Sequence, residues 1–229
     1  GRTYRRRRGL PDQEEFAYQY AISDAANPLE AMMAMEPEVR NHVLQRLRTK
    51  DDLLLDMLSR EIHMDAVERW YRVTSHGELA DASFRRSTAF LGELAKKVVT
   101  ARALWAATNL IMGVYHDDYE AFKTFWKMLD SRQLASSFSS EENLEAAAHC
   151  MASLRAMDKS LFGELVKAMD PIQVAERLST GTSAKRISQF VAEILRGDVA
   201  KGRDIWGRLN HRELAKLTRR AAGVVDATS

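Results

Sequence analysis

The chain has 229 residues and a net charge of +2, from 34 Lys and Arg against 32 Asp and Glu, and 45% of its residues are hydrophobic. This composition excludes a disordered chain, and the near-neutral charge does not by itself indicate nucleic acid or an anionic membrane as a partner. Four prolines and eleven glycines are few for an all-β protein, so the composition favours helix.

Cys150 is the single cysteine, which excludes an internal disulfide and a cysteine-based zinc cage. We therefore expect an intracellular protein, cytoplasmic or organellar. The longest uncharged stretch, residues 103–115, is too short and too polar to cross a bilayer, so no membrane span is expected. Because the chain begins at Gly1 without an apolar leader, we expect a fragment or a processed chain without a secretory signal.

In chain order, residues 1–11 form a basic tail containing Arg5, Arg6, Arg7 and Arg8. These arginines are either a contact for nucleic acid or a membrane surface, or simply a solvated tail. Residues 12–37 are predicted to form a helical N-terminal cap with a break near Asn27-Pro28. Residues 38–222 are predicted to form tandem helical repeats, in units that begin near 38, 78, 118, 158 and 198, followed by a tail over 223–229.

The repeat is visible as matches at an interval of 40 residues. Leu129-Asp130, Met169-Asp170 and Leu209-Asn210 follow this interval without a gap. The same interval relates several further columns: Leu94-Ala95, Leu134-Ala135, Val174-Ala175 and Leu214-Ala215; Asp118, Asp158 and Asp198; Leu104, Leu144 and Ala184. Such regular spacing is typical of repeat architectures.

Helix starts recur within each unit. The first Asp column and the Asp130, Asp170 and Asn210 column are predicted helix N-caps, and Pro171 suits the first position of a helix. Ser139 with Glu142 is predicted to form a capping box, and Thr182 or Ser183 takes that place in the next unit. The unit near 78 is a diverged copy with Phe90 at the second cap. We therefore predict an all-α fold, a right-handed α-solenoid of armadillo/HEAT-like repeats with three helices each.

The segments 129–139 and 169–179 resemble the helical-repeat arrays that follow the NTPase domain in some bacterial STAND-type proteins. That resemblance implies a sensor or oligomerisation arm, often in defence against phage, although this chain lacks a phosphate-binding loop. A second similarity, through Ala103-Leu104-Trp105-Ala106, is to organellar RNA-binding helical repeats.

Clusters that could carry chemistry have a simpler structural interpretation. His116-Asp117-Asp118 could bind a metal, but it lies at a junction between units where polar turn residues are expected. His149-Cys150 could be a base and a thiolate, but neighbouring residues point to different sides of a helix. We therefore expect a non-enzymatic protein with no cofactor and no metal site. Trp70, Trp126 and Trp206 are predicted core residues.

A binding surface is predicted one and five positions after the core column of the third helices. It consists of Trp105, Asn109, His149, Lys185 and Gln189. Trp105 is either exposed, as its equivalents Glu145 and Lys185 suggest, or packed against the preceding unit. The predicted function is a scaffold that binds a protein partner. The alternative is an RNA-binding array that uses Arg5 to Arg8 and the basic C-terminal region.

Overall fold

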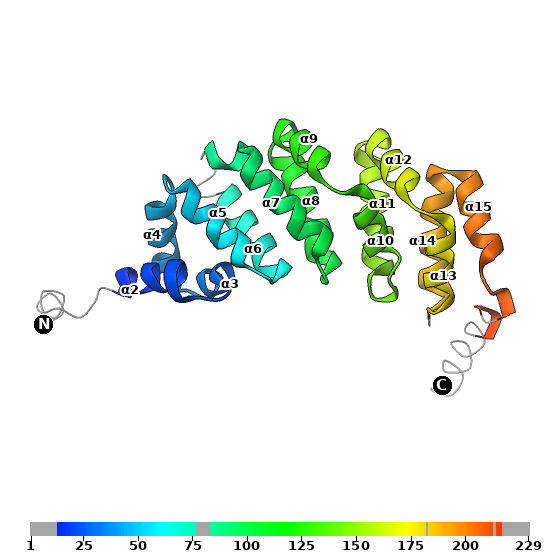
Figure 1. Cartoon of the computed structure of the whole chain (residues 1–229), viewed down its shortest axis with the longest axis horizontal. Helices are drawn as coiled ribbons and strands as arrows, with labels where there is room; N and C mark the ends of the chain where they lie inside the picture. The colour runs from blue at the N-terminus through cyan, green and yellow to red at the C-terminus, as the bar shows by residue number, and fades with distance from the viewer. Residues whose placement is uncertain (1–12, 77–82, 182, 213, 217–229) are drawn as a thin grey trace, which may run out of the picture. The chain divides into compact units, whose positions relative to one another are not determined.

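The computed structural model describes residues 13–76, 83–181, 183–212 and 214–216. Within these ranges the chain is all-α, with no β-strand. It divides into two compact units, Gly1–Leu129 and Asp130–Ser229, and each is described by itself (Figure 1). None of the helices in the described part combines the length and the apolar character needed to cross a bilayer.

Unit 1 begins with a short helix, a π-helical turn and a second short helix, and the break between the last two coincides with the one predicted near Asn27-Pro28. Three longer helices follow, then a 3-10 turn and three more helices. The elements are α2 (Gln13–Gln19), η1 (Tyr20–Asp24), α3 (Pro28–Met33), α4 (Pro37–Leu47), α5 (Asp51–Arg60), α6 (Met64–Ser75), η2 (Ser83–Arg86), α7 (Thr88–Thr100), α8 (Leu104–Asp117) and α9 (Tyr119–Met128).

The core of unit 1 is centred on aromatic side chains from α6, η2 and α7. Trp70 is fully buried, and Phe84 and Phe90 lie edge to face with their ring centroids 4.9 Å apart. Trp70 lies 5.9 Å from Phe90 by the same measure. Edge-to-face packing of this kind adds to the free energy gained from burying the rings.

Unit 2 continues the alternation of short and long helices. Its elements are α10 (Ser131–Phe138), η3 (Glu141–Asn143), α11 (Leu144–Met157), α12 (Lys159–Ala168), α13 (Pro171–Ser179), α14 (Ala184–Gly197) and α15 (Val199–Arg208). The two long helices α11 and α14 pack against each other, and α14 also packs against α15 (Figure 1).

Helix boundaries recur at the interval seen in the sequence. The helices α8, α11 and α14 begin at Leu104, Leu144 and Ala184, and they end at Asp117, Met157 and Gly197. The following helices α9, α12 and α15 likewise begin and end 40 residues apart. The interval therefore applies to whole helices and not only to scattered residue matches.

The predicted aspartate caps are confirmed. The Asp118 carboxylate accepts hydrogen bonds from the backbone N–H groups of Glu120 and Ala121, both at 3.1 Å. Asp158, Asp198, Asp130 and Asp170 accept equivalent bonds at the starts of α12, α15, α10 and α13. Each carboxylate satisfies N–H groups that the first turn of a helix leaves without an intrahelical partner.

Two other cap predictions need correction. The capping box of Ser139 and Glu142 is wrong, because the Ser139 hydroxyl donates to the Ser136 carbonyl at 3.0 Å and α11 begins only at Leu144. In α7 the cap is Ser87, whose hydroxyl accepts from the N–H of Phe90, so this helix begins three residues earlier than the column position. Ser183 caps α14 as predicted.

Most predicted core residues are buried, including Leu144, Leu154, Cys150, Trp70 and Trp126. Trp206 is the exception: it is 41% exposed, so its assignment to the core was wrong. At the equivalent position in α12, Val166 is covered by the end of α14, where a Cβ on Gly197 would lie only 2.9 Å from Val166 Cγ2. No helix of the described part covers α15 in that way, and Trp206 instead contacts the ring of His211.

Candidate functional site

The five residues of the predicted binding surface are all exposed, and Trp105 has 47% of its surface accessible. Trp105 and Asn109 lie on α8 in unit 1, whereas His149 lies on α11 and Lys185 and Gln189 lie on α14 in unit 2. The structure therefore brings the last three onto two helices that pack together, and it leaves the first two on a separate unit.

The exposed side of α11 and α14 carries charge of both signs. Glu145, the equivalent of Lys185, forms an ion pair with Arg186 at 3.5 Å that links the two helices. The next residue after His149, Cys150, is fully buried on the opposite side of α11. The exposed imidazole and the buried thiol therefore do not form a catalytic pair, and Cys150 is a core residue.

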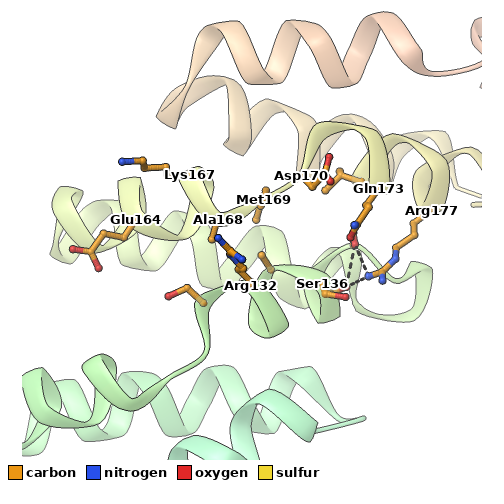
Figure 2. Close-up of a pocket in the computed structure, with 13 residues that line it drawn as sticks. Arg132, Ser136, Glu164, Lys167, Ala168, Met169, Asp170, Gln173 and Arg177 are labelled. Atoms are coloured by element: carbon orange, nitrogen blue, oxygen red, sulfur yellow. Dashed lines mark hydrogen bonds between the residues drawn. The ribbon is translucent and has the colours of Figure 1, made fainter.

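A second surface feature of unit 2 is a groove of about 700 Å³ between α10, the end of α12 and α13 (Figure 2). Its floor includes Ala135, Met169 and Val174, which are apolar and almost fully buried. The groove exists because small side chains such as Ala135 and Ala168 leave space between the helices, which larger residues would fill.

Three basic side chains line this groove: Arg132 from α10, Lys167 from α12 and Arg177 from α13. Figure 2 shows Arg132 reaching below Ala168 and Arg177 directed toward Ser136. The Arg177 guanidinium donates to the Ser136 carbonyl and, at 3.1 Å, to the Ser139 hydroxyl. Both acceptors are neutral, so these bonds position the guanidinium without cancelling its charge.

The acidic residues of the groove are fewer, and one is already engaged. Asp170 accepts the N–H of Ile172 at 2.9 Å as the cap of α13, and Glu164 lies toward the other end, beside Lys167 (Figure 2). In contrast, neither Arg132 nor Lys167 makes an ion pair through its side chain among the residues that the structure describes. The groove consequently presents an excess of positive charge over an apolar floor.

Local sequence explains how the groove residues are positioned. Asp130 and Asp170 start α10 and α13 at equivalent points, so Arg132 lies in the first turn of α10 and Gln173 in the first turn of α13. The sequence analysis did not identify Arg132, Lys167 or Arg177. A usable signal was the Gln133 and Gln173 column, because it repeats a polar residue directly after each cap.

The cluster His116-Asp117-Asp118 lies on a polar pocket in unit 1, where arginines compensate both carboxylates. Arg85 pairs with Asp117 at 3.3 Å, and Arg86 pairs with Asp118 at 2.5 Å. Arg85 also stacks over the ring of Tyr71, and burial raises the pKa of Tyr71 to about 12. These pairings give the two aspartates a structural role, in agreement with the junction interpretation.

Glu30, Glu61 and His63 form another cluster, with ligand-type atoms within 4.8 Å of one another. Glu61 is fully buried, and its carboxylate accepts the backbone N–H groups of Glu30 and His63, each at 2.9 Å. These bonds join the start of α3 to the end of α5. A buried carboxylate requires such donors, so the contacts account for Glu61 as a structural residue.

The predicted nucleic-acid contact at Arg5, Arg6, Arg7 and Arg8 lies outside the described residues. Comparison of the chain with family models, with curated proteins and with solved structures finds no match. The function must therefore be argued from the chain's own surfaces.

Proposed function

We propose that the chain is a non-enzymatic helical-repeat module that binds a protein partner, built as an α-solenoid of armadillo/HEAT-like repeats. The observation that supports this most strongly is that α8, α11 and α14 expose the same positions. Trp105, Glu145 and Lys185 are exposed one residue into each helix, and Asn109, His149 and Gln189 are exposed four residues later. Repeated helices commonly bind a partner along such aligned exposed positions.

The proposal extends to a biological setting. The resemblance of segments 129–139 and 169–179 to the arrays of STAND-type proteins suggests the sensor arm of a STAND-like defence system. An NTPase gene adjoining or continuous with this one would support that setting, whereas a gene context without any nucleotide-driven switch would count against it.

The binding proposal is tested by affinity capture from the source cells, with the bound proteins identified after nuclease treatment. The wild-type chain is compared with a Lys185→Ala, Gln189→Ala double variant and with Trp105→Ala. Both exposed substitutions in the double variant should leave the free energy of unfolding within about 0.5 kcal/mol. Capture of a specific protein should weaken in these variants, because an exposed Trp that becomes buried in an interface often contributes about 2 kcal/mol or more.

The alternative is an RNA-binding array, favoured by the exposed Arg208 and Arg212 near the end of the described chain. Arg208 is partly neutralised by Asp204 at 2.8 Å, which weakens this alternative. Binding dominated by phosphate contacts would fall steeply as salt rises, whereas capture through the exposed α14 positions should be less salt-sensitive. Loss of all captured material on nuclease treatment would favour RNA and contradict the first proposal.

A further inference from the structure

Within the proposed binding function, we propose that the groove between α10 and α13 is a docking site for an acidic, extended segment of a partner protein. This inference rests on the proposed function and adds the location and the chemistry of the segment. The argument depends on the three basic side chains, on the apolar floor and on the kinds of side chain that the lining lacks.

Charge complementarity identifies the segment as acidic. Arg132, Lys167 and Arg177 come from three different helices and converge on one groove. Arg177 is already held by the Ser136 carbonyl and the Ser139 hydroxyl, so a carboxylate that binds its remaining N–H groups meets a pre-positioned guanidinium. Arg132 and Lys167 are exposed at either side and can follow acidic groups along the segment.

The lining favours a peptide over nucleic acid. The floor at Ala135, Met169 and Val174 is apolar, which suits aliphatic side chains that alternate with carboxylates. None of the residues that line the groove is aromatic, so the groove offers no ring on which bases could stack. Glu164, at one end of the groove, would also repel a continuous phosphate backbone.

Gln173 gives the groove a means of recognising a backbone. Its side chain lies between Asp170 and Arg177 on α13, and Figure 2 shows it directed into the space above Ser136. A carboxamide can donate to and accept from a peptide group at the same time. The groove thus combines charge recognition, an apolar floor and a backbone hydrogen-bonding group.

The test is fluorescence anisotropy of the whole chain with labelled decaglutamate, with labelled decalysine as the opposite charge and labelled decauridylate as the nucleic-acid probe. The decisive variant is Arg132→Glu with Lys167→Glu. Its matched control is Lys159→Glu with Arg203→Glu, which reverses two exposed charges on α12 and α15 outside the groove. The two variants therefore have the same net charge.

The wild-type chain should bind decaglutamate, and the groove variant should bind it about tenfold more weakly or worse, since each reversal removes an attraction and adds a repulsion. The control should change affinity less than about threefold. Equal losses in the two variants, or no binding of decaglutamate, would overturn the inference. Tighter binding of decauridylate with the same dependence on Arg132 and Lys167 would overturn it in favour of nucleic acid.

The outcome is separable from that of the proposed function. If the groove variant still captures the protein partner while the Lys185 and Gln189 variant does not, the groove inference fails and the binding function stands. If decaglutamate binding depends on the groove but no protein is captured from the source cells, the function fails instead. Far-UV circular dichroism of each variant confirms that the helices remain folded.

Discussion

Asp118 combines two roles that occur separately elsewhere in the chain. It caps α9 and pairs with Arg86. Partial burial disfavours its charged form, but the N–H of Ala121, the Arg86 guanidinium and the N–H of Glu120 together outweigh this and hold its pKa below the ordinary value. Ionised Asp118 therefore stabilises the folded state.

This pKa predicts a pH dependence of stability. Because the folded pKa is lowered, the stabilising contribution is complete above the ordinary range of an aspartate, about pH 4, and is lost as the pH falls through the lowered value. An Asp118→Asn variant keeps a capping oxygen but loses the charge. Its deficit in free energy of unfolding, measured by urea denaturation, should be present at neutral pH and should disappear in acid.

Arg86 supplies the control. In an Arg86→Gln background, Asp118→Asn should cost less than in the wild type, because the ion pair is already absent. A deficit of the same size at every pH would contradict the assignment of the effect to the charge of Asp118.

At the scale of the helix, lysines act as C-terminal caps for helices distant in sequence. Lys201 Nζ donates to the carbonyls of Val166, Lys167 and Met169, each at 2.8 Å, at the end of α12. Lys97 Nζ donates to the carbonyls of Ser59 and Glu61 at the end of α5. In both places one ammonium satisfies carbonyl groups that the last turn of a helix leaves open.

Replacing Lys201 with Met should therefore lower the free energy of unfolding by about 1 to 3 kcal/mol, because it removes a charged donor from three carbonyls. Lys167→Met is the matched control: this lysine is exposed on the same helix end and should change stability by no more than about 0.5 kcal/mol. Equal effects of the two substitutions in urea denaturation would show that the bonds of Lys201 are not stabilising.

The long helices of unit 2 depend on a buried leucine column. Leu144 and Leu154 lie on α11 and are 1% and 0% exposed. Truncation of either to Ala should cost about 2 to 5 kcal/mol through the lost burial and the cavity that remains. Gln189→Ala, an exposed change on the adjacent α14, serves as the comparison in the same denaturation experiment. Losses below about 0.5 kcal/mol at both leucines would mean that the orientation of α11 is wrong.

At the scale of the whole molecule, the two units are built from the same kinds of helix. Far-UV circular dichroism should therefore show a predominantly helical chain. A substantial β signal would contradict the fold.

The residues that form the helix starts could be predicted from the sequence alone. The aspartate caps, the break at Asn27-Pro28 and the burial of Leu144, Leu154 and Cys150 depend on local hydrogen bonding and on the three- and four-residue spacing of apolar side chains. Both properties are encoded in neighbouring residues. That is why the 40-residue interval in the sequence is also the interval of the helix boundaries.

Contacts between helices were decided only by the tertiary structure. Trp206 has the same position in its helix as Val166, yet it is exposed, because burial depends on whether another helix covers that position. Ser139 hydrogen-bonds to Ser136 and Arg177 and not to the start of α11. Arg132, Lys167 and Arg177 form one groove although up to 45 residues separate them. Their convergence depends on how three helices pack, which no local pattern in the sequence records.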